Sequence, residues 1–204
     1  MTVEDRFKDR YKSGRTPWDV GFADFNLIET VTNTPIAPCK ALEIGCGTGD
    51  NSIWLATYGF NVVATDVSDV ALDKAREKAA QAHVTCDFRQ IDFLRNRVDG
   101  APFGFIFDRG CFHAFGSDDE RNQFAQNAAA HLAEGGLWLS LSGNADEDRQ
   151  GPGPPQRSAR DIVLAVEPYF EILLLQTSHF GSKNPQPPRA WRCLMRKRHY
   201  SDIP

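Results

Sequence analysis

The sequence contains neither a long hydrophobic run nor a hydrophobic leader. Nowhere do about 18 apolar residues follow one another, which is roughly the length that a membrane-spanning helix needs. The first ten residues mix acidic and basic side chains and lack the apolar segment of a secretory signal. We therefore expect a protein that is neither secreted through a signal peptide nor embedded in a membrane.

The cysteines lack the pattern of a disulfide framework or a zinc site. There are five of them, an odd number, and no two form a Cys-x-x-Cys pair. The five histidines are not grouped with them at ligand spacing. These absences predict a reduced, cytoplasmic protein that binds no metal.

An excess of basic charge is also missing. The 23 Lys and Arg residues are outnumbered by 27 Asp and Glu residues, and no basic stretch alternates with aromatic side chains. Nucleic acid and anionic membranes are therefore not expected as partners. The length of 204 residues suffices for one complete core, so we expect a single domain over residues 1–204.

Hydrophobic spacing predicts a pair of N-terminal helices followed by alternating strands and helices. The pair covers residues 4–33, with a loop between its members. We expect strands over residues 41–44, 61–66, 83–89, 103–108, 136–142, 169–180 and 190–198, and helices from the glycines to Tyr58 and over residues 68–81, 118–133 and 158–167. Strands separated by helices form parallel sheets, whereas the last two strands are joined by a loop and should be antiparallel.

The most informative segment is Leu42-Glu43-Ile44-Gly45-Cys46-Gly47-Thr48-Gly49-Asp50, in which a strand meets three alternating glycines. A helix that Asp50 or Asn51 is expected to cap follows. Glycine permits a tight turn and close approach to a ligand, and Cys46 would contribute only its backbone. The spacing is G-x-G-x-G, whereas a dinucleotide-binding turn has G-x-G-x-x-G. Glu43 beside the turn disfavours a diphosphate and suits a ligand that carries an ammonium and a sulfonium.

Acidic residues follow the next two predicted strands. Asp66 ends the second strand, where a carboxylate in a doubly wound sheet accepts hydrogen bonds from ribose hydroxyls. Asp92 and Phe93 follow the third strand. Asp92 could accept a hydrogen bond from an adenine amine, while Phe93 or Val67 covers the ring. Together these residues predict an adenosine pocket at the carboxyl ends of the strands.

With these motifs, the chain resembles the class I S-adenosylmethionine-dependent methyltransferases. The resemblance implies an α/β, Rossmann-like, doubly wound sheet of seven strands whose last strand is antiparallel, with helices on both faces. It implies an N-terminal helical lid over residues 1–36 on a core over residues 37–204. The cofactor would be S-adenosyl-L-methionine. The expected cofactor-binding residues are Trp18, Glu43, Gly45, Cys46, Gly47, Gly49, Asp50, Asn51, Asp66, Val67, Asp92, Phe93 and Asp108.

Two further segments are similar to the thiopurine, thiol, halide and tellurite-resistance group of small-molecule methyltransferases. They are Thr16-Pro17-Trp18-Asp19 and Asp108-Arg109-Gly110-Cys111-Phe112-His113. The resemblance implies that Trp18 closes over the methionine end of the cofactor. It also marks three candidate catalytic residues after the fourth strand, Asp108, Arg109 and His113.

The candidate roles have simpler alternatives. Asp108 could bind the cofactor ammonium, and Arg109 could hold an anionic substrate or form a structural pair with Asp108. His113 could be a general base or a hydrogen-bonded structural residue. A thiol acceptor would need no dedicated base, whereas an oxygen or nitrogen acceptor would need one.

We expect methyl transfer to a small-molecule nucleophile, a thiol or another soft acceptor, by a monomer or homodimer. The alternatives are a nicotinamide-dependent oxidoreductase on a Rossmann sheet and a non-catalytic domain that binds S-adenosylmethionine.

Overall fold

The computed structural model describes residues 3–34, 36–149 and 151–199. Their strands form one sheet with the order β3-β2-β1-β4-β5-β8-β7. These strands are β1 (Lys40–Ile44), β2 (Asn61–Asp66), β3 (Asp87–Gln90), β4 (Phe103–Arg109), β5 (Leu132–Asn144), β7 (Phe170–His179) and β8 (Arg189–Lys197). The last strand in the chain, β8, runs antiparallel to both of its neighbours, β5 and β7. The expected seven-stranded mixed sheet is therefore confirmed.

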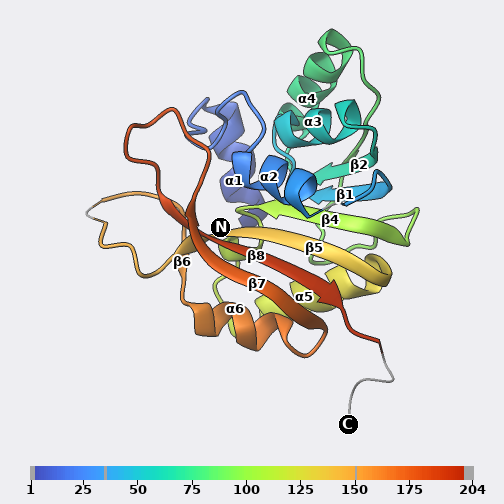
Figure 1. Cartoon of the computed structure of the whole chain (residues 1–204). Helices are drawn as coiled ribbons and strands as arrows, with labels where there is room; N and C mark the ends of the chain where they lie inside the picture. Colours follow the sequence, from blue (N-terminus) through green and yellow to red (C-terminus); the bar gives the residue numbers. More distant parts are fainter. Residues whose placement is uncertain (1–2, 35, 150, 200–204) are drawn as a thin grey trace.

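Helices cover both faces of this sheet (Figure 1). On one face lie α2 (Phe25–Asn33), α3 (Asp50–Thr57) and α4 (Asp69–Gln81), and α1 (Val3–Lys12) packs against α4. On the other face lie α5 (Asp118–His131) and α6 (Ala159–Val166). The central strand β4 is buried on both faces, with Phe105 and Phe107 in one core and Ile106 in the other. This is the burial pattern of a parallel strand between two helical layers.

Several element boundaries differ from the predictions. The strand expected from residue 83 begins at Asp87, because His83 adopts a left-handed φ of 56° at the end of α4. The fifth helix ends at His131, and β5 begins directly after it at Leu132. The third helix is not capped by the Asp50 or Asn51 side chain. Its N-cap is Gly49, whose left-handed conformation turns the chain into the helix.

The end of β5 carries a feature that the sequence did not predict. β5 extends to Asn144, whereas its pairing with β4 ends at Arg109 and Leu141. Beyond that point the two-residue strand β6 (Gln156–Arg157) pairs with Gly143 and Asn144. The edge of β5 therefore passes from one neighbour to another at the carboxyl end of the sheet.

The carboxyl ends of the parallel strands are bordered by three irregular segments. They are the chain between α1 and α2, the loop from β5 to β6 and the loop from β7 to β8, which gather at the same end of the sheet in Figure 1. This is the end at which open α/β sheets bind ligands. In the described residues, no helix is both long and apolar enough to cross a membrane.

Candidate functional site

The turn between β1 and α3 is built on three glycines in left-handed backbone. Their φ angles are 71° at Gly45, 55° at Gly47 and 83° at Gly49, a region in which other L-residues are strained. The amides of Gly45 and Cys46 donate to the carbonyl of Thr65 at 2.8 and 2.9 Å, which fixes the turn to β2. The Cys46 thiol is buried and directed to the carbonyl of Gly47. The predicted tight turn is therefore present.

Neighbouring side chains leave no room for a Cβ in this turn. A Cβ on Gly49 would lie 2.9 Å from the Cβ of Ala75, and one on Gly47 would lie 2.5 Å from the hydroxyl oxygen of Tyr11. The turn is thus packed against α4 on one side and against α1 on the other. Glycine is required here by space as well as by conformation.

Asp66 lies beside the turn at the end of β2. Its carboxylate accepts hydrogen bonds from the amides of Gly47 at 2.8 Å and Ser68 at 2.9 Å, and the side chain is buried. Burial raises the pKa of Asp66, and these backbone hydrogen bonds oppose that change. Two amide donors leave acceptor capacity on a carboxylate, which suits the predicted ribose contact. The next residue, Val67, is half-buried, and its carbonyl accepts from the Gln90 side chain.

Glu43 is directed into the protein. It is 1% exposed and accepts hydrogen bonds from the side chains of Asn51, at 3.0 Å, and Ser52. Burial is the main reason why the pKa of Glu43 is raised to about 7. The side chain therefore ties β1 to the first turn of α3, and a direct contact with the cofactor stays a prediction.

A polar cluster joins the N-terminal segment to the glycine turn. Lys78 Nζ on α4 contacts the Thr48 hydroxyl at 2.7 Å and both carboxylate oxygens of Asp50 at 3.0 Å. The Thr48 hydroxyl donates to Asp19 at 2.7 Å, and Asp19 lies 3.6 Å from Lys78. Asn51 accepts a hydrogen bond from the amide of Asp24 at 2.9 Å. Asp50 and Asn51 thus hold in place the chain between α1 and α2 (residues 13–24), which we call the N-terminal covering segment, in addition to any contact with a ligand.

Tyr11 was missed by the sequence analysis, although it lies on the glycine turn. It is 4% exposed, and its hydroxyl accepts a hydrogen bond from Nε1 of Trp18 at 2.9 Å. Phe7 packs edge to face against Trp18 with ring centroids 5.4 Å apart. Burial is the largest cause of a raised Tyr11 pKa, so the phenol stays protonated. The helical i, i+4 spacing of Phe7 and Tyr11 was the available signal.

The residues after β3 only partly match the prediction. Asp92 caps its own turn by accepting from the amide of Leu94 at 3.0 Å, and it lies 3.5 Å from Arg95. The Phe93 ring is 4% exposed and packs against Phe124 in the core beneath α5. The expectation that Phe93 or Val67 covers an adenine ring stays a prediction, and the direction of the Phe93 side chain into the core favours Val67.

Asp108 also faces inward. Its carboxylate accepts hydrogen bonds from the amides of Cys111 at 3.2 Å and Phe112 at 3.0 Å, and from Nε1 of Trp138 at 3.0 Å. The side chain is fully buried, and burial raises its pKa to about 6. Asp108 therefore holds the loop after β4, residues 110–117, against the core. This arrangement does not direct it toward a cofactor ammonium.

Arg109 points to the face of the sheet opposite to Asp108. It contacts two covering segments, the N-terminal one (residues 13–24) and the β7–β8 loop (residues 180–188). Its guanidinium contacts the Asp24 carboxylate at 2.7 Å, the Gly181 carbonyl at 2.8 Å and the Trp18 carbonyl at 3.3 Å. It also lies over the Phe180 ring at 5.2 Å. Asp24, in turn, is 1% exposed and accepts from the amide of Gly181 at 2.8 Å. Of the two alternatives for Arg109, the structural pair with Asp108 is thus replaced by a pair with Asp24.

His113 occupies the position at which β4 no longer pairs with β5. The amide of Gly143 in β5 donates to His113 Nδ1 at 2.8 Å. The ring nitrogen thus accepts a hydrogen bond from β5 at a position where β4 no longer supplies a carbonyl. Burial, followed by the charges of Arg157 and Arg109, lowers the pKa of His113 to about 3. The neutral ring therefore carries its proton on Nε2 and presents a donor there. A role as general base stays a prediction that this hydrogen bond disfavours.

The cysteine after β4 borders the same site. The Cys111 side chain packs against Gly45, where an added Cβ would lie 3.0 Å from the Cβ of Cys111. Burial raises the pKa of its thiol. Within residues 3–34, 36–149 and 151–199, no group of three or more metal-ligating side chains comes together.

Comparisons with known proteins show similarity to methyltransferases. Residues 41–136 match the family model described as a methyltransferase domain. The chain is 35% identical over 110 residues to an uncharacterised methyltransferase of Schizosaccharomyces pombe, covering 54% of this chain and 76% of the relative. It is 29% identical over 166 residues to the probable thiol methyltransferase 2 of Arabidopsis thaliana, covering 80% of this chain and 69% of that protein.

A solved structure shows the same fold over nearly the full length. It was determined for work on the conversion of a disulfide bond into a thioacetal group during echinomycin biosynthesis. Its TM-score is 0.83 at 21% identity, and the match covers 98% of this chain and 95% of that one. With the glycine turn and Asp66 in place, these findings favour methyl transfer over the oxidoreductase and non-catalytic alternatives. The chain belongs to the class I S-adenosylmethionine-dependent methyltransferases.

Proposed function

We propose that this methyltransferase acts on a small, soft nucleophile, a thiol in its thiolate form, at the carboxyl ends of β4 and β5. S-adenosyl-L-methionine supplies a methyl group on a sulfonium sulfur. As the bond between the acceptor sulfur and the methyl carbon forms, the bond from that carbon to the sulfonium breaks. The products are a thioether and S-adenosylhomocysteine, and the proton of the thiol has already left to solvent.

The cofactor half of the site, residues 43–51 with Asp66 and Val67, fits the cofactor. The left-handed glycines form the tight turn that this motif implies, and the buried Asp66 carboxylate retains acceptor capacity for ribose hydroxyls. Tyr11 covers Gly47 from the N-terminal segment, and Trp18 donates a hydrogen bond to the Tyr11 hydroxyl. We assign Gly45, Gly47, Gly49 and Asp66 direct cofactor contacts. The backbone of Cys46 and the side chains of Trp18, Val67 and Asp92 complete the proposed set.

The preference for a soft acceptor rests on one observation, that neither of the two candidate bases, Asp108 at the end of β4 and His113 after it, is available. Both oxygens of Asp108 are occupied by protein donors, and the Gly143 amide occupies Nδ1 of His113. Free thiols have a pKa near 8.5, so a useful fraction ionises near neutral pH without help. The similarity to a protein named probable thiol methyltransferase 2 supports the same choice.

The protein's own contribution is then alignment and exclusion of water. Arg109 joins the N-terminal segment to the β7–β8 loop through Asp24 and Gly181. The glycine turn is held by contacts of Glu43 with Asn51 and of Asp50 with Lys78. Asn51 also binds the amide of Asp24 in the N-terminal covering segment. We propose these as positioning residues, together with Asp108.

The remaining proposals concern the protein's setting. We propose a single domain with residues 1–36 as a lid, acting as a monomer or homodimer in the cytoplasm and without a nucleic-acid partner. All five cysteines are unpaired, which supports a reducing compartment.

Calorimetric titration with S-adenosylmethionine, S-adenosylhomocysteine and NAD tests the cofactor assignment. We expect micromolar binding of both sulfur compounds and none of NAD, and loss of binding in Asp66→Ala. Turnover is then measured with thiols, halides, metalloid oxyanions and phenols. Thiols should be methylated most efficiently, with a rate that rises through the pKa of the thiol itself.

Two results would contradict the proposal. Binding of S-adenosylmethionine by Asp66→Ala as tight as by the wild type would remove the ribose assignment. Phenols methylated faster than thiols would require a base and would overturn the choice of acceptor.

A further inference from the structure

The loop after β4 (residues 110–117) presents buried backbone carbonyls that its own turn does not satisfy. Phe112, His113, Ala114 and Phe115 are each at most 8% exposed. Their short 3-10 turn uses the carbonyls of Cys111 and Phe112, but not those of His113 and Phe115. Buried carbonyls are costly without a donor. The conformation of this loop therefore depends on donors from elsewhere in the chain.

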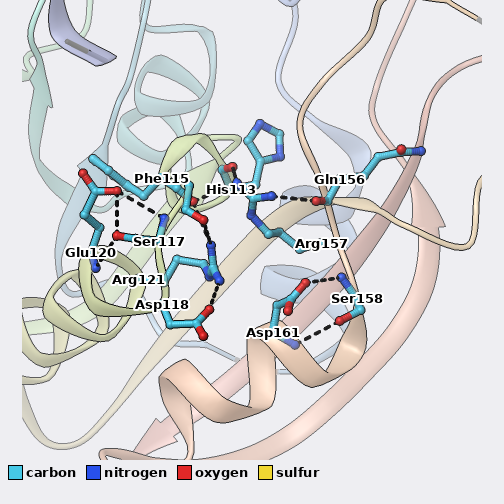
Figure 2. A network of polar contacts seen from close by, with 11 residues as sticks. His113, Phe115, Ser117, Asp118, Glu120, Arg121, Gln156, Arg157, Ser158 and Asp161 are labelled. Atoms are coloured by element: carbon cyan, nitrogen blue, oxygen red, sulfur yellow. Dashed lines mark hydrogen bonds and ion pairs between the residues drawn. The ribbon is translucent and has the colours of Figure 1, made fainter.

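Arg157 supplies these donors. Its Nη2 donates to the carbonyl of His113 at 2.8 Å and to that of Phe115 at 2.7 Å, and its Nη1 donates to the carbonyl of Gln156 at 2.8 Å (Figure 2). All of these acceptors are backbone atoms. The charged guanidinium thus holds backbone carbonyls and pairs with no carboxylate in these three contacts.

Arg157 itself is held by the sheet. It belongs to β6, where it pairs with Asn144 of β5, and its carbonyl accepts from Nε1 of Trp191 on β8 at 2.9 Å. Figure 2 shows its side chain reaching from β6 to the loop. Arg157 therefore connects the rigid carboxyl end of β5 to the loop after β4.

Arg121 approaches the same loop from α5 and differs in its partners. It donates to the carbonyls of Phe115 and Gly116 at 3.0 and 2.8 Å, and it also pairs with the carboxylate of Asp118 on its own helix. Arg121 therefore also stabilises the first turn of α5, in which Asp118 lies. Arg157 reaches the carbonyl of His113, which Arg121 does not contact.

His113 links Arg157 to the β7–β8 loop. Its main chain is held by Arg157, its Nδ1 accepts from Gly143, and its ring packs edge to face against Phe180 at 5.9 Å. Phe180 in turn lies beneath Arg109. One guanidinium on β6 thus fixes the main chain of His113, whose ring reaches Phe180 and so the β7–β8 loop.

We propose that Arg157 is a positioning residue for the acceptor, which it serves by fixing the His113 and Phe115 carbonyls and so the loop after β4. The inference rests on the proposed function, because it takes this loop as the acceptor's wall. Arg157 should affect acceptor turnover and leave cofactor affinity unchanged.

The test uses Arg157→Gln, with Arg157→Lys as the conservative variant and Arg160→Gln as the matched control. Arg160 is exposed on α6, three residues away, and its substitution removes the same charge. The acceptor is 4-nitrothiophenol, whose thiolate absorbance is lost on methylation. We expect kcat/KM for this thiol to fall about 30-fold in Arg157→Gln, as a misplaced wall would cause.

The remaining readouts separate positioning from general damage. The Kd for S-adenosylmethionine should change by less than about 3-fold, because Arg157 holds His113 and Phe115, whereas Cys111, which packs against Gly45, is held by Asp108. Arg157→Lys should recover part of the rate, since an ammonium can donate to both carbonyls. Arg160→Gln should behave as the wild type. Parallel losses of rate and cofactor affinity, or no loss of rate, would overturn the inference.

A nuclear magnetic resonance measurement keeps the inference testable if the wild type methylates no thiol. In that case the proposed function fails, and the His113 ring nitrogens and the Gly143 amide become the readout. Arg157→Gln should shift these signals and leave the Gly47 amide in place. Unchanged His113 and Gly143 signals would contradict the positioning role.

Discussion

The cofactor half of the site (residues 43–51 with Asp66 and Val67) and the acceptor half (Arg109, residues 110–117 and Arg157) are stabilised in different ways. In the cofactor half, neighbouring β1 and β2 are joined by backbone amides and by Gly47 bonding to Asp66. In the acceptor half, two arginines donate to carbonyls on segments far apart in the sequence.

The difference follows from what each half has to do. A turn that touches an invariant ligand can be specified by local backbone conformation, which glycine spacing encodes directly. A wall that faces a variable acceptor is made of loops, and loops need side-chain donors to hold a fixed shape. The acceptor half should therefore lose its structure through single side-chain changes that the cofactor half would tolerate.

The largest effect is expected for Arg109→Met, which leaves the Asp24 carboxylate buried without its partner. Asp24 is 1% exposed and retains only amide donors in this variant. Removing one member of a buried pair costs about 3 to 5 kcal/mol. Urea unfolding should show a loss of this size, and Arg109→Met combined with Asp24→Asn should recover part of it.

The matched control for Arg109 is Arg192→Met. Arg192 on β8 also contacts α2, through Glu29 at 3.1 Å, but that glutamate side chain is 52% exposed. An exposed pair contributes about 0 to 1 kcal/mol. Equal losses in the two variants would contradict the view that Arg109 joins the covering segments through a buried contact.

Glu43→Gln should stabilise the protein, in contrast to Arg109→Met. The pKa of Glu43 is raised from 4.5 to about 7, so the folded state retains a proton that the unfolded state releases first. Stability from this group is therefore lost as the pH rises from about 4.5 to 7, by about 3 kcal/mol in all. Glutamine has no proton to lose and removes this penalty.

The measurement is urea unfolding of the free protein at pH 5 and pH 8. Glu43→Gln should match the wild type closely at pH 5 and exceed it at pH 8. Glu77→Gln on the exposed side of α4 is the control and should show no such difference between the two pH values. A Glu43→Gln protein that is less stable at pH 8 would show that the hydrogen bonds to Asn51 and Ser52 outweigh the burial of charge.

The fold was largely predictable because its signals are local. Strand and helix order follow from hydrophobic spacing, and the helix expected over residues 68–81 is α4, with Ser68 as its N-cap. The missed features depend on contacts between distant segments. β5 extends to Asn144 because β6 and His113 satisfy its edge, and neither could be inferred from the residues of β5 alone.

For the site, too, local features could be predicted from the sequence, whereas features that depend on contacts between distant segments could not. The glycine turn lies where its motif implies, whereas the orientation of Asp108 depends on Trp138, thirty residues away on β5. Arg109 was expected to bind a substrate or Asp108, yet it pairs with Asp24 because the two sides of β4 face different layers. Residue type indicated that these side chains matter, but only the packing decides which way they point.

Gly47→Ala probes the cofactor half directly. The added Cβ would lie 2.5 Å from the Tyr11 hydroxyl, in backbone with a φ of 55°. Displacing Tyr11 should weaken binding of S-adenosylmethionine about 30-fold, or about 2 kcal/mol. Gly135→Ala is the control, because its φ of 67° imposes similar strain with no atom within 4 Å of the new Cβ. Unaltered binding by Gly47→Ala would show that Tyr11 does not need to lie on the turn.

The smallest effect is expected for Asp19→Asn, which weakens the contact between the covering segment and the cofactor half. Asp19 lies 3.6 Å from Lys78, and their side chains are 20% and 32% exposed. Asparagine can still accept from Thr48, so only the charge is lost, worth about 0.5 kcal/mol. The dissociation rate of S-adenosylmethionine should rise about twofold at low salt and match the wild type at 1 M salt, because salt screens exposed pairs. The loss in free energy of unfolding caused by Arg109→Met should be the same at both salt concentrations, since Asp24 is buried. Equal salt sensitivity in the two variants would mean that the cover is held to both halves by the same kind of contact.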